Sequence, residues 1–331
     1  MAFFPVSNSN LSASHLGDFI SKKYAVGDVT GCSLIRSGIN DTYMVSTSQK
    51  RFVFRVYSLN WRTEKEIAEE LRLLDLLKEK EISISYPIAD KEKAYIHVLS
   101  APEGNRYGVL FSFAEGEKLH SFTTDVHYAI GRMMAEFHLV TDGLSVDRTT
   151  YTPQLLVKDP LHPISRFLSD TSEEMKFMKM AQGFLWDELE RANLGSLRKG
   201  VVHLDIWYEN LNVDTNNQVT LFDFDFCGNG WLCLDIAFYM LQVYSIERDE
   251  KERDRKMAAF FEGYESVTKI PEEERKLLPV LGVSLYFFYL GIQCQRYDNW
   301  SNHFLSESYL KRYIHQLVKR YFDIHQLGKN K

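Results

Sequence analysis

The part of the chain that most constrains its fold is the stretch 201–226, with the sequence VVHLDIWYENLNVDTNNQVTLFDFDF. Short apolar runs in this stretch flank a segment rich in Asn and Asp, and the last run, Val219–Phe222, ends at Asp223. Runs of strand length separated by turn-forming residues predict a β-hairpin. We expect this hairpin to bring Asp205, Asn210 and Asp223 to the mouth of one cleft.

The residue types at these positions suit the transfer of a phosphoryl group. That chemistry needs groups that position the reactants and neutralise charge, and Mg²⁺ prefers oxygen ligands. We assign Asp205 as the base that orients an acceptor hydroxyl. Asn210 and Asp223 are the expected Mg²⁺ ligands, and Asp225 is a further candidate. The alternative, that all of them are turn residues capping a hairpin, explains each residue singly but not their ordered set.

A family resemblance follows from the spacing of these residues. The set His203-x-Asp205-x4-Asn210, Asp223-Phe224-Asp225 and Leu234-Asp235-Ile236-Ala237 resembles the aminoglycoside phosphotransferase/choline kinase family, whose members have a protein-kinase-like fold. The resemblance implies an α+β chain of two lobes. Residues 1–115 would form a nucleotide-binding N-lobe with a small antiparallel β-sheet and a helix, and residues 116–331 a larger, mostly α-helical C-lobe with the catalytic hairpin and the acceptor-binding helices.

The resemblance also assigns Asp235 a structural role at the start of a helix. The chain departs from the family pattern at Leu204, where Gly is usual. It departs again at Trp207, Tyr208 and Glu209, where the family has small residues, His or Pro. The spacing of the expected metal ligands survives, so these departures bear on the identity of the acceptor more than on the chemistry.

The N-terminal third predicts a helix at 11–26 and then strands on either side of a turn at Gly38. The resemblance implies that the loop with Gly38 and Asn40 covers the phosphates of ATP, since glycine lets backbone amides approach an anion closely. An ordinary hairpin turn is the alternative. Residues 51–57 (RFVFRVY) alternate as a strand that would direct Phe52, Phe54 and Val56 to one face.

The resemblance implies that Arg55 occupies the place of the Lys that contacts the ATP phosphates in a kinase lobe; the alternative is an exposed basic residue on a half-buried strand. A helix is expected at 62–80, capped by Thr63 and Glu66. Glu70 on this helix is the expected partner of Arg55, with Glu66 and Glu69 as alternatives. Strands at 94–99 and 107–113 complete a predicted five-stranded antiparallel sheet. The resemblance then implies a lobe boundary near residue 116 and adenine binding by the backbone at Ser112 and Ala114.

The remainder of the chain predicts helices, including 173–194, 236–244, 252–267, a run from Pro271 to Tyr297, and 307–326. His138 is expected to be a core histidine. In the family this helical region supplies the acceptor pocket, and the candidates here are Trp207, Tyr208, Tyr289, Arg296, Tyr297, Asp298 and Trp300. Aromatic rings with one acid could hold an amine, and Arg296 could instead hold a carboxylate. Core aromatic residues on packed helices are an equally open interpretation.

Composition restricts the partners of the chain. The net charge of −6 argues against a nucleic-acid-binding protein. The four Cys are scattered without metal-site spacing, the N-terminus lacks the pattern of a signal peptide, and the apolar stretches look too short to span a membrane. We therefore expect a reduced, cytoplasmic protein with no nucleic-acid or membrane partner.

The sequence thus predicts an ATP- and Mg²⁺-dependent phosphotransferase that acts on a hydroxyl of a small molecule, such as an amino-alcohol, an amino acid like homoserine, or an aminoglycoside-like compound. The stretch FVFRVY and the later IAEE resemble the homoserine kinase type II and bacterial stress-response Ser/Thr kinase branch. A protein Ser/Thr kinase of the stress-response type is therefore one alternative. A nucleotide-binding pseudokinase is another, although the chain keeps Asp205, Asn210 and Asp223.

Overall fold

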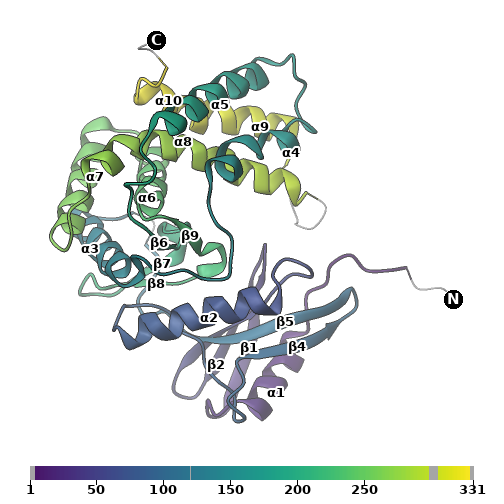
Figure 1. The fold of residues 1–331 in the computed structure, drawn as a ribbon. Helices are drawn as coiled ribbons and strands as arrows, with labels where there is room; N and C mark the ends of the chain where they lie inside the picture. Colours follow the sequence, from purple (N-terminus) through teal and green to yellow (C-terminus); the bar gives the residue numbers. More distant parts are fainter. Residues whose placement is uncertain (1–3, 120, 298–304, 329–331) are drawn as a thin grey trace. The chain divides into compact units, whose positions relative to one another are not determined.

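The computed structural model describes residues 4–119, 121–297 and 305–328. The chain divides into two compact units (Figure 1), and we describe each by itself. The described part of unit 1 comprises residues 4–115 and 220–222, and that of unit 2 comprises residues 116–219, 223–297 and 305–328.

Unit 1 contains a five-stranded antiparallel sheet in the order β1-β2-β3-β5-β4. The strands are β1 (Val29–Ser37), β2 (Asp41–Thr47), β3 (Arg51–Val56), β4 (Ile96–Ala101) and β5 (Gly104–Ser112). The predicted five-stranded sheet is confirmed. β4 begins two residues later than expected because the carboxylate of Asp90 accepts the N–H of Ala94, which holds that segment in a turn.

The two faces of this sheet carry different helices (Figure 1). On one face, Phe52, Phe54 and Val56 join an apolar core with Leu16 and Ile20 of α1 (Ala13–Lys23), as the alternation in β3 predicted. On the other face lies α2 (Glu64–Glu79), which contacts Arg55 and Tyr57 through Glu70. The predicted capping box of Thr63 and Glu66 is present at the start of α2.

Unit 2 is mainly helical. Its α-helices are α3 (Thr124–Thr141), α4 (Leu161–Ile164), α5 (Glu173–Arg191), α6 (Cys233–Ile246), α7 (Glu250–Glu265), α8 (Glu272–Gln295), α9 (Glu307–Tyr313) and α10 (Arg320–Ile324). Its shorter helical segments are the π-helical Gln154–Lys158 and Ile314–Lys319 and the 3₁₀ turns Tyr208–Asn210 and Phe224–Phe226. The predicted single helix at 307–326 is therefore interrupted by a π-helical segment. The sheet of unit 1 and the helices of unit 2 make an α+β chain, as predicted.

Two strand pairs include residues of the stretch 201–226. The predicted hairpin is β7 (Leu211–Val213) with β8 (Val219–Leu221), closed by a turn in which Asp214 Oδ1 accepts the N–H of Gln218 at 2.8 Å. Val201 and Val202 belong instead to β6 (Lys199–Val202), which pairs with β9 (Gly228–Trp231). We did not predict this second pairing.

Helices α3 and α7 cross at two glycines. A Cβ on Gly131 would lie 2.0 Å from the carbonyl oxygen of Phe260, and one on Gly263 would lie 2.0 Å from that of Tyr128. Neither glycine can therefore carry a side chain without separating the two backbones. The close packing of α3 on α7 therefore requires glycine at both positions.

The apolar character of α8 corrects one expectation from the sequence. By length and composition alone, Glu272–Gln295 could cross a membrane, although 72% of its apolar window is buried within the fold. Such burial is that of a core helix.

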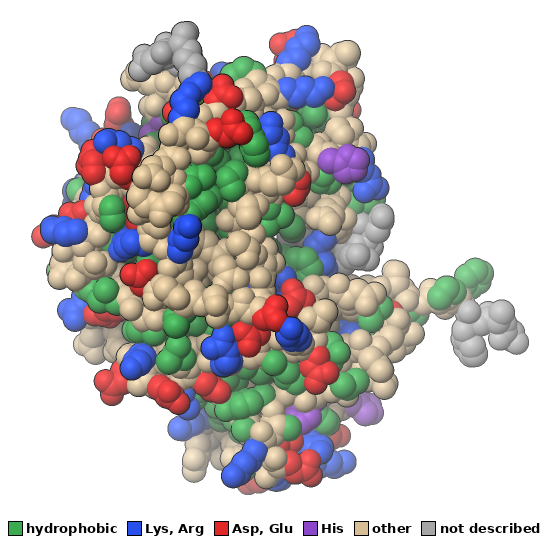
Figure 2. Space-filling model, in the orientation of Figure 1, with side chains coloured by type: hydrophobic (Ala, Val, Ile, Leu, Met, Phe, Trp, Pro, Cys, Tyr) green, Lys and Arg blue, Asp and Glu red, His purple; other side chains and the backbone are tan. Residues whose placement is uncertain are grey.

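On the face drawn in Figure 2, Lys and Arg side chains of the described residues lie among Asp and Glu side chains rather than in one basic patch.

Candidate active site

The turn after β6 carries the predicted base, and it has an unusual backbone. Leu204 has a φ of +62°, a conformation that favours glycine, and its side chain is fully buried. From the first turn of α6, Asp235 accepts the N–H of His203 at 2.9 Å and that of Leu204 at 2.6 Å. The hydroxyl of Tyr289 donates to the carbonyl of Leu204. The turn is therefore held from two helices, and Asp235 has the structural role expected for it.

Asp235 is itself fixed by a buried chain of polar groups. His138 Nε2 lies 3.2 Å from Asp235 Oδ2, and His138 Nδ1 lies 2.7 Å from the hydroxyl of Tyr264. His138 and Asp235 are completely buried. Burial raises the pKa of Tyr289 and of Tyr264, so both hydroxyls keep their protons. His138 is a core histidine, as predicted.

The structure brings Asp205 and Asn210 into direct contact. The amide nitrogen of Asn210 donates to Asp205 Oδ2 at 2.7 Å and to the carbonyl oxygen of Asp205 at 3.0 Å. The backbone N–H of Asp205 donates to His203 Nδ1 at 3.1 Å. Because the amide nitrogen of Asn210 faces Asp205, its Oδ1 is left as the acceptor atom of this side chain. That oxygen is of the kind Mg²⁺ prefers.

Asp223 follows β8 and has a φ of +66°, which Asp tolerates better than most residues. The next residue, Phe224, packs the edge of its ring against His203, with 4.4 Å between the ring centroids. The loops of Asp205 and Asp223 are therefore neighbours. Asp225 is buried, and its carbonyl oxygen accepts a hydrogen bond from Arg148.

The donor set of these loops fits a metal that is partly coordinated by a substrate. Among the residues that the structure describes, no three His, Cys, Asp or Glu side chains gather closely enough to hold a metal ion by themselves. One Asn oxygen and one carboxylate leave coordination positions for phosphate oxygens and water, and Mg²⁺ is usually bound in this way.

In unit 1 the predicted ion pair between β3 and α2 is present. Arg55 Nη1 lies 2.9 Å from Glu70 Oε1, and the hydroxyl of Tyr57 donates to Glu70 Oε2 at 3.3 Å. Arg55 is 8% exposed and Glu70 is fully buried. The alternatives have other roles, because Glu66 caps α2 and Glu69 pairs with Arg72.

The loop with Gly38 and Asn40 connects β1 to β2. The side-chain oxygen of Asn40 accepts the N–H of Ser58 at 3.2 Å, and the hydroxyl of Ser58 donates to the carbonyl of Ile39. Within the loop, the N–H of Gly38 donates to the carbonyl of Asn40 at 3.2 Å. The loop is thus tied to the residues that follow β3, the strand of Arg55.

The backbone of Ser112 is already engaged within unit 1. Its N–H donates to the carbonyl of Tyr86 at 2.8 Å, and its carbonyl accepts the hydroxyl of Ser85 at 2.6 Å. The N–H of Ser112 is thus committed, whereas its carbonyl oxygen has a second lone pair and can accept a further hydrogen bond. Ala114, the other predicted contact, is 6% exposed.

The candidates on the acceptor side lie in different surroundings. Tyr208 is buried and stacks on Phe122 with 4.2 Å between ring centroids, which favours a core role. Tyr289 is committed to the turn of Leu204. Trp207 is partly exposed, Tyr297 is 45% exposed, and Arg296 is 7% exposed. Asp298 and Trp300 lie outside the described residues.

A cavity of about 320 Å³ in unit 2 was not predicted. Its lining includes Asp159, His162, Arg166, Phe288 and Gln295, which come from the segment around α4 and from α8. Spacing along the sequence gave no signal for it, because its two walls are more than a hundred residues apart.

Several known proteins are similar to this chain in sequence or in fold. The model described as "Phosphotransferase enzyme family" matches residues 31–270. A homoserine kinase of Agrobacterium fabrum is 26% identical over 299 residues, which is 85% of each chain. The structure of a microcompartment-associated aminopropanol kinase superposes with a TM-score of 0.78 at 20% identity, covering 95% of this chain and 99% of that one. An amicoumacin kinase in complex with AMP-PNP and Ca²⁺ has a TM-score of 0.76 at 17% identity, covering 96% and 98%.

Proposed function

The chain belongs to the phosphotransferase enzyme family, and from this premise we propose that it transfers the γ-phosphoryl group of ATP to a hydroxyl of a small molecule in the presence of Mg²⁺. The observation that carries the proposal is the bond between Asn210 and Asp205 in a turn held by Asp235. This bond orients the carboxylate of Asp205 so that it can accept a hydroxyl proton. It also leaves the amide oxygen of Asn210 as the atom that can bind a metal ion.

Each residue has a defined task in this reaction. Asp205 accepts a hydrogen bond from the acceptor hydroxyl and takes its proton as the oxygen bonds to the γ-phosphorus and the bond to the ADP oxygen breaks. Asn210 Oδ1 and the carboxylate of Asp223 would hold Mg²⁺, which supplies charge neutralisation at the phosphates when bound. Arg55, oriented by Glu70, contacts phosphate oxygens, and the loop with Gly38 and Asn40 covers them. The backbone of Ser112 and Ala114 contacts the adenine, and at Ser112 the contact is through the carbonyl oxygen, because the N–H is bonded to Tyr86.

We propose that the acceptor lies in the cavity beside α8 and carries both an amine and a hydroxyl. The lining offers a carboxylate at Asp159 and a guanidinium at Arg166, and its Phe288 ring lies 6.4 Å from that of Phe226, close after Asp223 in the chain. Homoserine and aminopropanol, which the names of two similar proteins contain, both have this chemistry. Trp207 and Tyr297, which are not buried, are the aromatic candidates for the acceptor side.

The experiment is a screen of amino-alcohols and hydroxy-amino acids for ATP consumption. In Asp205→Asn we expect kcat to fall by about 10²–10⁴-fold while ATP–Mg²⁺ still binds. In Asp223→Ala the Mg²⁺-dependent thermal shift with ATP should be lost. Asp214→Asn is the control, because it makes the same change on the same hairpin at a turn position where Asn serves equally well. Undiminished turnover in Asp205→Asn would refute the assigned base.

The same screen separates the other functions that the sequence left open. Transfer of labelled phosphate to the chain itself, with no small acceptor used, would indicate a protein kinase. Binding of ATP without turnover on any acceptor would indicate a pseudokinase. For the acceptor cavity, Arg166→Ala should raise KM for the acceptor but leave ATP binding unchanged, and the exposed Arg191 on α5 provides a matched Arg→Ala control.

A further inference from the structure

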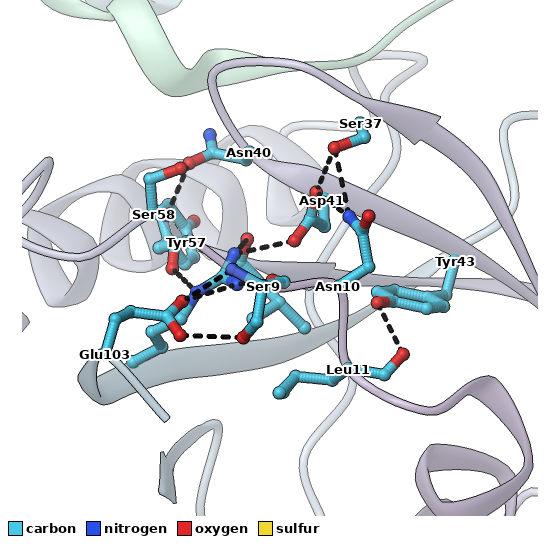
Figure 3. Close-up of polar contacts among 12 residues, drawn as sticks. Ser9, Asn10, Leu11, Ser37, Asn40, Asp41, Tyr43, Tyr57, Ser58 and Glu103 are labelled. Atoms are coloured by element: carbon cyan, nitrogen blue, oxygen red, sulfur yellow. Dashed lines mark hydrogen bonds and ion pairs between the residues drawn. The ribbon is translucent and has the colours of Figure 1, made fainter. Parts of the chain in front are cut away.

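A short N-terminal segment, Ser9–Leu11, is bonded into unit 1 ahead of α1 (Figure 3). We call it the N-terminal strap, and it precedes the residues 31–270 that the family model matches. The hydroxyl of Ser9 donates to Glu103 Oε2 at 2.7 Å, and the carbonyl of Leu11 accepts the hydroxyl of Tyr43 at 2.8 Å. The strap is therefore fixed at both ends to strands or turns of the sheet.

The middle residue of the strap contacts both ends of the β1–β2 loop. The amide nitrogen of Asn10 lies 3.1 Å from Ser37 Oγ and 3.1 Å from Asp41 Oδ1, and Figure 3 shows its side chain directed at both. Ser37 also donates to Asp41 Oδ1 at 2.7 Å. Ser37 and Asp41 are the paired residues that close the loop with Gly38 and Asn40.

Asp41 is the anchor of this arrangement. Its second oxygen, Oδ2, accepts from Arg106 Nη2 at 2.8 Å, and Arg106 also donates to the carbonyls of Tyr57 at 2.8 Å and of Ser9 at 2.7 Å. Arg106 is 1% exposed and Asp41 is 3% exposed. A buried ion pair with its remaining donors satisfied is rigid, because any displacement leaves a charge without partners.

The loop is thus held unequally at its two ends. The Asp41 end is bonded to the core through Arg106, whereas Ser37 is exposed and its side chain bonds to Asp41 and to Asn10 of the strap. Loops with exposed hydrogen bonds open at low free-energy cost, so the bonds of Asn10 restrict the end of the loop that is otherwise freer.

We propose that the N-terminal strap positions the β1–β2 loop for the nucleotide phosphates and that Asn10 is the positioning residue. The inference rests on the proposed function, in which this loop covers the phosphates. A loop that is ordered before the nucleotide arrives does not have to be ordered by it, so binding is tighter. The bonds of Asn10 are partly exposed, and losing them should weaken nucleotide binding by about three- to tenfold.

The test compares Asn10→Ala with Asn8→Ala in the full chain. Asn8 is exposed, and it offers the same substitution two residues earlier. Hydrogen exchange of the amides of residues 37–41 is measured without nucleotide, and the dissociation constant of AMP-PNP with Mg²⁺ is measured by titration calorimetry. In Asn10→Ala we expect faster exchange in the loop and a dissociation constant raised about three- to tenfold, with neither change in Asn8→Ala.

A purely structural role would lower the unfolding midpoint without changing loop exchange or nucleotide affinity, and that result overturns the inference. Faster exchange with an unchanged dissociation constant also overturns the inference. In that case the strap would order the loop, but this ordering would contribute nothing to nucleotide binding. If the wild-type chain fails to bind AMP-PNP at all, the proposed function falls, and the exchange data alone then decide whether the strap orders the loop.

Discussion

The substitution Asp235→Asn tests the support of the turn that carries Asp205, the proposed base. In the structure the two oxygens of Asp235 accept three hydrogen bonds, from the N–H groups of His203 and Leu204 and from His138 Nε2. An Asn side chain has one oxygen, and its amide group would face at least one of these donors. The change keeps the size of the side chain and removes only the charge and one acceptor.

The expected loss of stability follows from these contacts. The least costly orientation of Asn sacrifices one charge-assisted bond, worth about 1.5–3 kcal/mol, and leaves a buried N–H unsatisfied at a further cost of about 1–3 kcal/mol. We expect the free energy of unfolding to fall by about 3–5 kcal/mol, which is a large part of the usual 5–15 kcal/mol. Displacement of the turn also misplaces Asp205, so kcat should fall by about 10²-fold.

The assay is urea unfolding followed by tryptophan fluorescence, together with kcat on the acceptor found in the screen. The matched control is Asp249→Asn, which makes the same change at the N-cap of α7, where Asp249 accepts the N–H of Glu252 at 2.9 Å. Asn caps a helix as well as Asp does, so the control should change stability by less than about 0.5 kcal/mol. If Asp235→Asn loses less than about 1 kcal/mol and keeps its kcat, the reasoning about the turn is wrong.

Three further substitutions test the ion pair, a buried histidine and the helix crossing. Glu70→Ala removes the fully buried carboxylate that pairs with Arg55 and should cost about 3–5 kcal/mol in urea unfolding. Glu69→Ala on the same helix removes a partly exposed pair and should cost little, so equal effects would contradict the assigned pair. Burial lowers the pKa of His127 to about 4, so between pH about 6.5 and about 4 only the unfolded chain binds the proton and stability falls as the pH falls. His127→Gln should remove roughly 3 kcal/mol of this loss at pH 4. If the free energy of unfolding of the variant changes with pH as steeply as that of the wild-type chain, the loss does not come from His127. Gly131→Ala should lower the free energy of unfolding by at least about 1–3 kcal/mol, because the added Cβ would clash where α3 meets α7. Gly183→Ala, with open space around it, should stabilise the chain slightly. If alanine is tolerated at both sites, the close approach of α3 to α7 is refuted.

Elements with strong local signals were predicted well. The strand of RFVFRVY was predicted because its apolar alternation directs Phe52, Phe54 and Val56 to one buried face. The helix α2 was predicted because its capping box lies within four residues of sequence. The pairing of Arg55 with Glu70 followed from the family resemblance, which implies a Glu partner on the helix after this strand, and from the position of Glu70 at the edge of the apolar stripe of that helix. The strand and the helix needed only local sequence patterns, whereas the ion pair also needed the resemblance.

Contacts between distant segments gave no such signal. Arg106 and Asp41 are 65 residues apart, and nothing in the sequence around either one indicates the other. The pairing of β6 with β9 and the cavity beside α8 were missed for the same reason. The engagement of the Ser112 N–H by Tyr86 was also invisible, because backbone hydrogen bonds depend on register rather than on residue type.

The departure from the family pattern at Leu204 has a physical explanation in the structure. A left-handed conformation costs a residue with a side chain about 1–2 kcal/mol relative to glycine. The side chain of Leu204 is fully buried, and burial of a Leu contributes about 1.5–3 kcal/mol, which offsets that cost. The backbone still has to be kept in the unfavourable region, and the 2.6 Å bond from the N–H of Leu204 to Asp235 does this. Leucine at this position is therefore compatible with phosphotransfer chemistry, and Asp235 carries more of the stability of the turn here than it would in a chain with glycine at 204.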